Sequence, residues 1–323
     1  MNYRVLGRTG FEVSEVGHGL WGAGSWSGSL DDVSLGAMQA SVDLGCNFFD
    51  SAWAYGEGRS DRLLGELLRA NRQKRLYVAA KVPPKNRKWP ASSSDRYEEV
   101  FPREYVLEFA DRIRAEIGVD TIDLLQLHVW DDSWSASKVW HDTISELKRR
   151  NIISAFGVSV NRWQPSNGIL AVESGHVDAV QVIYNIFEQA PEDALFAACR
   201  KHNVGVIARV PLDEGSLSGS LTKDTRFPAD DWRASYFGPD NLGPTVNRVE
   251  ALKAILPKSM DLAAMAMRFV LSNEQVSTTI AGMRTVEHVR ANLTASDRGR
   301  LDPGLIHALR AHRWDRVITP GAK

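Results

Sequence analysis

The stretch NFFDSAWAYGEGRSDRLLGELL, Asn47–Leu68, contains one complete strand–loop–helix unit. The strand is expected over Cys46–Phe49, a short apolar run that ends at Asp50, and a glycine-containing loop follows it. The helix is expected beyond the loop because leucines three or four residues apart share one face of a helix. These leucines are Leu63, Leu64, Leu67 and Leu68.

The same alternation of short β-prone runs and longer segments of helical period extends in both directions along the chain. Alternating strands and helices predict a parallel sheet, and eight such units predict a closed (β/α)₈ barrel. A doubly wound sheet is the alternative, but no GxGxxG motif opens a helix. The expected strands are Val16–Leu20, Cys46–Phe49, Leu76–Val82, Ile122–Leu127, Ile152–Val158, Val177–Ile183, Gly205–Ala208 and Ser277–Ala281.

The 323 residues would fit roughly two average domains, but barrels of this kind exceed the average, so we expect one domain over 1–323. The surplus length falls in long βα loops and a C-terminal helix near Pro303–His312. Ser29 with Asp32 predicts a capping box at the first helix, whose apolar stripe would begin at Val33. The connection Pro211–Pro244 is too long for an ordinary loop and predicts a lid.

Composition excludes several classes of protein. Lys and Arg number 39 against 40 Asp and Glu, which gives no support to binding of nucleic acid or of an anionic membrane. Two cysteines, Cys46 and Cys199, without a CxxC motif exclude a disulfide framework and a thiolate zinc cluster. We expect a soluble cytoplasmic protein with no bound metal, and the composition permits a homo-oligomer.

Residues able to do chemistry gather at the expected strand ends, where barrel active sites lie. Asp50, Lys81 and His128 follow or end neighbouring strands, and Tyr55 lies in the loop after Asp50. An ammonium group near a phenol lowers the pKa of that phenol, so Lys81 would favour proton release by Tyr55. Asp50 would hold Lys81, and His128 would orient a substrate oxygen. The set predicts a proton donor for a carbonyl oxygen.

These residues carry a resemblance to the aldo-keto reductase superfamily over nearly the whole chain. It includes the opening Asn2–Gly10 (NYRVLGRTG), the segment Val16–Gly22 (VGHGLWG) and, most strongly, Asn47–Leu68. The family lysine falls in VAAKV and the family histidine in DLLQLH. The resemblance implies a catalytic tetrad of Asp50, Tyr55, Lys81 and His128. It also implies reduction of a small aldehyde or ketone by NADPH, with NADH possible, and without a metal or a Rossmann motif.

The resemblance further implies which residues bind the cofactor, with some departures from the family pattern. Ser159 and Gln181 would hold the carboxamide, together with Asn161, although Val160 separates the serine from the asparagine. Arg209 stands where many relatives stack an aromatic ring on the nicotinamide. The adenosine end would lie along Gly282, Arg284, His288 and Asn292, where a glycine and a histidine replace commoner residues. The pyrophosphate loop would include Leu212, Gly215, Ser216, Leu217 and Gly219.

Several interpretations stay open. Trp21, Trp53 and Trp130 would line the substrate pocket or simply pack within loops. Arg209 is either a cofactor residue or an ion-pair partner of Asp213 or Glu214. Arg284 is either a phosphate ligand or a solvated charge, and Tyr184 faces either the cofactor or the core. Two rival functions are a Schiff-base lyase with Lys81 as nucleophile and an NADPH-binding sensing subunit with little turnover.

Overall fold

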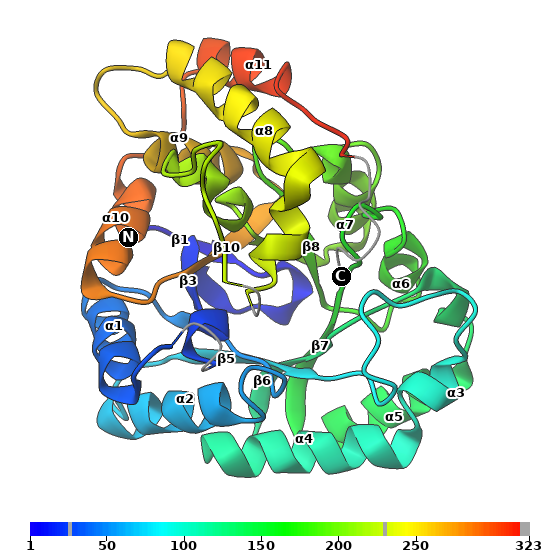
Figure 1. Ribbon diagram of the computed structural model, residues 1–323. Coiled ribbons are helices and arrows are strands. Elements are labelled where there is room, and N and C mark those ends of the chain that lie inside the picture. Colours follow the sequence, from blue (N-terminus) through cyan, green and yellow to red (C-terminus); the bar gives the residue numbers. More distant parts are fainter. Residues whose placement is uncertain (25–27, 229–230, 317–323) are drawn as a thin grey trace.

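Eight parallel strands close into a barrel in the computed structural model, whose described residues are 1–24, 28–228 and 231–316 (Figure 1). Around the barrel the order is β10-β3-β4-β5-β6-β7-β8-β9. The predicted barrel is therefore confirmed, and each expected strand is present with small shifts of its ends. The strands are β3 (Val16–Gly19), β4 (Phe48–Asp50), β5 (Tyr77–Val82), β6 (Ile122–Leu127), β7 (Ile153–Ser159), β8 (Ala179–Ile183), β9 (Gly205–Arg209) and β10 (Val276–Gly282).

Helices surround the barrel on its outer side (Figure 1). They are α1 (Asp31–Asp43), α2 (Arg59–Ala70), α3 (Tyr97–Val100), α4 (Arg103–Ile117), α5 (Lys138–Arg149), α6 (Ile169–Glu173), α7 (Leu195–His202), α8 (Arg233–Ala254), α9 (Leu262–Ser272), α10 (Val286–Asp297) and α11 (Pro303–Arg310). Short 3₁₀ turns are η1 (Gly7–Thr9), η2 (Leu20–Ala23), η3 (Asp132–Trp134), η4 (Ala190–Glu192) and η5 (Asp213–Ser218).

The apolar interior divides into two parts. A large cluster fills the space between strands and helices, and a smaller one fills the lower part of the barrel itself. An antiparallel hairpin of β1 (Tyr3–Val5) and β2 (Glu12–Ser14) contributes Leu6 and Val13 to the smaller cluster. The amino end of the barrel is thus closed by apolar packing, which leaves the carboxyl ends of the strands for a site. The other members are Phe48, Ala79, Leu124, Ala155, Ala179, Ile207 and Ile280.

The first helix differs from the prediction. Its N-cap is Leu30 and no side chain caps it, so the Ser29 capping box is wrong. Val33 is exposed, whereas Ser34 and Ser41 face the interior with Ala37, Met38 and Val42. Small polar side chains are accommodated on the buried face, for example where Ser41 Oγ lies 2.8 Å from Nδ1 of the buried His18.

The long connection Pro211–Pro244 is also partly different from the prediction. The second half of this connection is helical: α8 begins at Arg233 and contains both Pro239 and Pro244. Gly238, with φ of 23° and ψ of 176°, interrupts the helix directly before Pro239, and proline is well suited to the first turn of a new helical stretch. Residues 229–230 lie outside the described part of the chain, and the lid stays a prediction.

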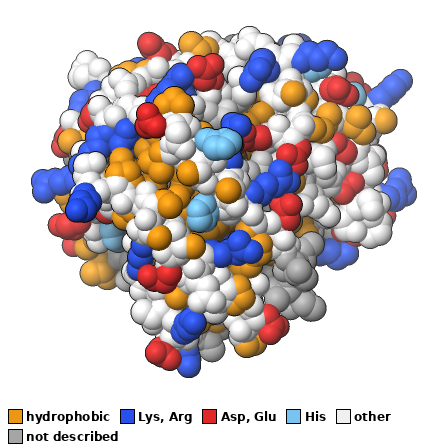
Figure 2. Space-filling view, turned by 90° about the horizontal axis from the view of Figure 1, so that it is seen from above, with side chains coloured by type: hydrophobic (Ala, Val, Ile, Leu, Met, Phe, Trp, Pro, Cys, Tyr) orange, Lys and Arg blue, Asp and Glu red, His pale blue; other side chains and the backbone are white. Residues whose placement is uncertain are grey.

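No helix in the described residues is long and apolar enough to cross a membrane. On the face shown in Figure 2, basic and acidic side chains are interspersed, as the near balance of 39 against 40 charged residues leads one to expect.

The contact between α2 and α4 gives a test of the packing. A Cβ on Gly65 would lie 2.3 Å from the carbonyl oxygen of Ile117, whereas one on the exposed Gly36 of α1 would meet nothing within 4 Å. We expect Gly65→Ala to lower the free energy of unfolding by about 1–3 kcal/mol through overpacking. Gly36→Ala should raise it by roughly 0.5–1 kcal/mol. Urea denaturation measures both, and a Gly65→Ala protein as stable as Gly36→Ala would contradict this account.

Candidate active site

A layer of polar side chains lies inside the barrel toward the carboxyl ends of the strands. Lys81 of β5 and Asp50 at the end of β4 are almost fully buried, and Lys81 Nζ lies 2.5 Å from Asp50 Oδ2. Lys81 Nζ also donates to the carbonyl oxygen of Ser51 at 3.0 Å. Gln181 of β8 donates to Asp50 Oδ1 at 2.9 Å, and Gln126 of β6 does so at 3.3 Å. The carboxylate is therefore held from three strands.

Gln126 was not predicted from the sequence. It faces into the barrel because residues of a strand alternate in direction, and it pairs in register with both Lys81 and Gly157. A Cβ on Gly157 would lie 3.1 Å from Gln126 Cγ and 2.8 Å from the carbonyl oxygen of Ala179. Glycine at 157 thus leaves the room in which Gln126 reaches Asp50. The signal in the sequence was a second polar residue, after Asp123, in the mainly apolar strand IDLLQL.

Tyr55 and His128 lie above this layer. Lys81 Nζ is 5.2 Å from the centre of the Tyr55 ring. The rings of Tyr55 and His128 meet edge to face with their centres 5.7 Å apart. The structure therefore brings Asp50, Tyr55, Lys81 and His128 together at one end of the barrel.

Burial and charge set the protonation of these groups. Burial raises the pKa of Tyr55, and the nearby Lys81 ammonium, which acts to lower it, does not outweigh burial. Lys81 does act to lower the pKa of Tyr55, as expected, but the pKa is nevertheless raised overall because burial has the larger effect. Burial acts to lower the pKa of Lys81, yet the Asp50 carboxylate and Tyr55 leave it raised. Burial, with the charges of Lys81 and Arg209, lowers the pKa of His128 well below its ordinary value.

These directions assign the charges at neutral pH. Lys81 is a cation, Tyr55 keeps its proton and His128 is neutral. Nδ1 of His128 is buried and has no hydrogen-bond partner among the residues that the structure describes. A neutral imidazole beside a protonated phenol can offer two hydrogen-bonding groups to a single oxygen atom.

The tryptophans divide differently from the prediction. Trp130 has no exposed surface, donates to Asp132 Oδ1 at 2.8 Å and packs against Trp134 and Trp140, so its assignment to a pocket wall is wrong. The tryptophan beside His128 is instead Trp89, with ring centres 5.8 Å apart.

The other two predicted pocket tryptophans contact different elements. Trp53 packs edge-on against Phe109 of α4 at 5.0 Å, with the Arg112 guanidinium over its ring. Trp21 lies edge-on to Trp232 at 5.8 Å. Neither of these ring contacts involves a residue of the tetrad, whereas the ring of Trp89 contacts His128.

Ser159, the last residue of β7, and Asn161, two residues beyond it, have different surroundings. Ser159 pairs in register with Gln181. Asn161 is buried, and its amide exchanges two hydrogen bonds with the backbone of Ala91, at 3.2 and 3.1 Å. The Asn161 side chain therefore holds the loop that carries Trp89, which argues against its predicted contact with a carboxamide.

Arg209 ends β9 and has an unsatisfied donor. One terminal nitrogen donates to the carbonyl oxygen of Val160 at 3.1 Å, while Nε is buried without a partner among the described residues. Burial, with the charge of Arg162, lowers the pKa of Arg209 to about 10. The alternative ion pairs are not formed, because Asp213 pairs with Arg316 at 2.5 Å and Glu214 with Arg162 at 3.3 Å.

The segment after β9 has an unusual backbone. Val210, Asp213 and Glu214 have φ of 58°, 46° and 54°, a region that non-glycine residues and above all β-branched ones rarely adopt. Such strain gathers at functional sites. Leu212, which precedes η5, is half-buried, Leu217 is fully buried, and Ser216 Oγ donates to Asp213. Gly215 and Gly219 also have positive φ, 99° and 77°, a conformation that glycine adopts without strain.

The predicted adenosine segment lies at the start of α10. Gly282, Arg284 and His288 are exposed, and Asn292 is buried on the inner face of the helix. Thr285 caps the helix by accepting from the His288 backbone N–H at 3.4 Å. A cation beside a helix N-terminus, where backbone N–H groups are unpaired, is suited to an anionic group.

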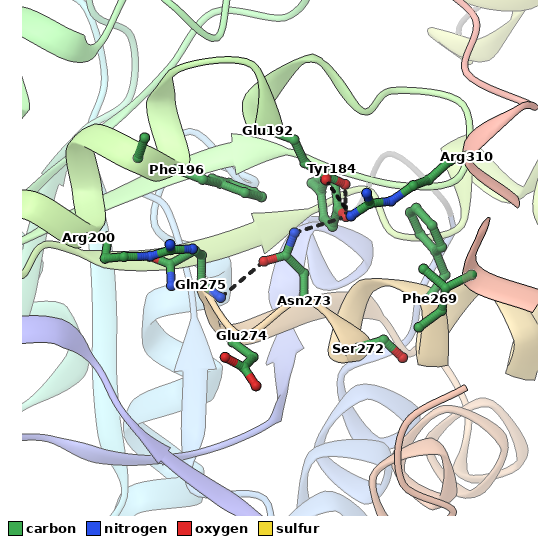
Figure 3. Close-up of a pocket in the computed structure, with 12 residues that line it drawn as sticks. Tyr184, Glu192, Phe196, Arg200, Phe269, Ser272, Asn273, Glu274, Gln275 and Arg310 are labelled. Atoms are coloured by element: carbon green, nitrogen blue, oxygen red, sulfur yellow. Dashed lines mark hydrogen bonds and ion pairs between the residues drawn. The ribbon is translucent and has the colours of Figure 1, made fainter. Parts of the chain in front are cut away.

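A pocket of about 390 Å³ lies away from the tetrad, between α7 and α9 (Figure 3). Tyr184 contacts Phe196 of α7 and Phe269 of α9, donates to Glu192 at 2.6 Å and accepts from Asn273 at 3.2 Å. Tyr184 therefore faces the helices, which decides the question that the sequence left open.

The sequence matches the model of the aldo/keto reductase family over residues 15–313. The barrel and its polar layer thus define an oxidoreductase of this class, and the chain belongs to the aldo/keto reductase family. By family it is an NAD(P)H-dependent oxidoreductase acting on carbonyl compounds.

Two relatives illustrate the match. The protein named "Uncharacterized oxidoreductase YqkF" of Bacillus subtilis is 24% identical over 97% of this chain and 96% of its own. The "NADH-specific methylglyoxal reductase" of Escherichia coli is 25% identical over 90% of this chain and 92% of its own. The solved structure of aldo-keto reductase AKR11C1 from Bacillus halodurans, in its holo form, has a TM-score of 0.78 at 22% identity and covers both chains fully, which supports the fold.

Titration of His128 tests the electrostatics of the site. Because burial and the Lys81 charge hold the pKa of His128 well below 6.5, we expect its ring resonances to stay constant in NMR spectra as the pH falls from 8 through 6.5. In Lys81→Met the removal of the cation should raise this pKa, so that the ring titrates at higher pH than in the parent protein. A His128 that titrates near pH 6.5 in the parent would contradict the assignment.

Proposed function

We propose that this protein reduces small or medium aldehydes or ketones to alcohols with NADPH, and that Tyr55 gives the proton to the carbonyl oxygen. The observation that carries the proposal is the buried Lys81–Asp50 ion pair directly beneath a protonated Tyr55 and a neutral His128. A carbonyl oxygen that gains negative charge needs a proton donor and a second hydrogen-bonding group, and the two rings offer both.

The residues present fit a nicotinamide dinucleotide. Arg209 has a buried Nε without a partner among the described residues, at the end of the strand beside the polar layer. A planar guanidinium can also stack on an aromatic ring. Arg284 stands exposed at the start of α10, where a guanidinium fork suits a 2′-phosphate. When bound, NADPH supplies the hydride that adds to the carbonyl carbon.

The side chains of the tetrad divide the remaining work. His128 positions the carbonyl oxygen beside the phenol, and the Tyr55 O–H bond breaks as its proton passes to that oxygen. The phenolate left on Tyr55 is stabilised by the Lys81 ammonium. Asp50, held by Gln126 and Gln181, keeps Lys81 charged and in place. Oxidation of an alcohol runs the same steps in reverse.

The rival functions fit the site less well. A Schiff base requires a neutral amine, whereas the pKa of Lys81 is raised by its contact with Asp50. A sensing subunit with little turnover would have no need of Tyr55 beside a buried ammonium, so that interpretation explains fewer of the contacts.

The Tyr55→Phe variant tests the proton donor. Loss of the hydroxyl should lower kcat for reduction of an activated aromatic aldehyde by about 10²–10⁴-fold. NADPH affinity, followed by fluorescence titration, should stay within about twofold because the ring is kept. Tyr105→Phe is the matched control, since the Tyr105 hydroxyl donates to the carbonyl oxygen of Pro83 outside the tetrad. A Tyr55→Phe protein with near-normal turnover would defeat the assignment.

Arg284→Ala tests the choice between the two cofactors. Removing a guanidinium that binds the 2′-phosphate should raise the Kd for NADPH about tenfold or more and leave the Kd for NADH within about twofold. Arg290→Ala removes an exposed arginine within α10, whereas Arg284 precedes that helix, and this control should change neither Kd. Equal weakening of both cofactors by Arg284→Ala would mean that Arg284 does not bind the 2′-phosphate.

A further inference from the structure

The segment after α11 returns to the carboxyl end of the barrel. In Figure 1 the red chain leaves α11 and runs back toward the side of α7 and β8. Arg313 pairs with Asp193 at 2.6 Å, and the Trp314 backbone N–H donates to the carbonyl oxygen of Phe187, beyond β8, at 2.8 Å. The segment is therefore tied to the loop that follows β8 before it reaches Arg316.

Arg316 ends this path in a buried ion pair. One terminal nitrogen donates to Asp213 Oδ2 at 2.5 Å, and the two side chains are 1% and 0% exposed. The guanidinium lies over the rings of Trp314 and Tyr236, at 4.4 and 4.9 Å from their centres. A buried charge requires its partner, so the position of Asp213 depends on Arg316.

Asp213 is the first residue of η5, and its contacts shape that turn. Besides Arg316, its carboxylate accepts from Tyr236 of α8 at 2.6 Å and from Ser216 at 2.5 Å. Asp213 and Glu214 both have positive φ, a conformation that persists only where the surroundings enforce it. Glu214 points to a different partner, Arg162. Two adjacent strained residues are thus fixed by two separate ion pairs.

We propose that Arg316 is a positioning residue for the cofactor, which holds the Leu212–Gly219 loop through Asp213 in the shape that binds the pyrophosphate of NADPH. The inference rests on the proposed function. It assigns the C-terminal segment a role in cofactor release, because the loop cannot leave that shape without separating a buried charge pair. A role restricted to folding would lower stability and leave the release rate unchanged.

Stopped-flow measurement of NADPH release tests the proposal, with NADP⁺ in excess as the competing ligand. In Arg316→Met we expect release about tenfold faster, because most changes in affinity appear in the dissociation rate. Hydride transfer in a single turnover at saturating NADPH should stay within about twofold, since the tetrad is intact. Arg313→Met, which removes an exposed ion pair of the same segment, should leave release within about twofold.

Two further measurements separate positioning from folding. Asp213→Asn should speed release as Arg316→Met does, and the double variant should be no faster than either single one, because the two residues act as a unit. Hydrogen exchange should increase in the amides of Leu212–Gly219 in Arg316→Met and stay constant in the barrel strands. Additive effects, or exchange that rises throughout the barrel, would overturn the proposal.

Milder variants apply if Arg316→Met does not fold. Arg316→Lys keeps the charge and can restore a single hydrogen bond, and Tyr236→Phe removes one contact of Asp213, so both should give intermediate release rates. Parental release rates in both variants would overturn the role of Arg316 and leave the proposed function intact. A parent protein that neither binds NADPH nor reduces a carbonyl would overturn both proposals.

Discussion

The buried ion pair of Lys81 and Asp50 is the interaction on which the rest of the site depends. Two charges removed from water cost several kcal/mol each unless hydrogen bonds and mutual attraction offset the loss. Here the ammonium also donates to Ser51, and the carboxylate accepts from Gln126 and Gln181. The barrel supplies these donors because its strands are parallel and their carboxyl ends converge. Closure of the sheet is thus what allows the charge pair to exist.

The pair in turn sets the state of the groups above it. Its cation lowers the pKa of His128 and opposes the effect of burial on Tyr55. Lys81 is therefore tied to two rings and one carboxylate, and removing its charge would raise the pKa of both rings. The polar layer and the two rings therefore behave as a single electrostatic unit.

The sequence was sufficient to predict the barrel and the gathering of the tetrad, because alternation of strands and helices and residues at strand ends are local patterns. The sequence was not sufficient to predict which side chains are buried by contacts between elements far apart in the chain. Val33 was expected in the apolar stripe of α1 but is exposed, whereas Ser34 and Ser41 lie on the buried face of that helix. Trp130 looked suited to a pocket, but only tertiary contacts show that it is enclosed by Trp134 and Trp140. The Asn161 amide hydrogen-bonds to the backbone of Ala91, a residue far away in the chain.

The hairpin of β1 and β2 has a consequence for the whole barrel. Leu6 and Val13 close the amino end with hydrocarbon, which polarises little and screens charge poorly. The amino end of the barrel therefore contributes little to damping the field of the charge pair. A polar side chain placed in the hairpin would admit water beneath the strands and weaken that field from below. The amino-terminal residues, at the opposite end of the barrel from the tetrad, thus help to determine how strongly the charge pair acts on the rings above it.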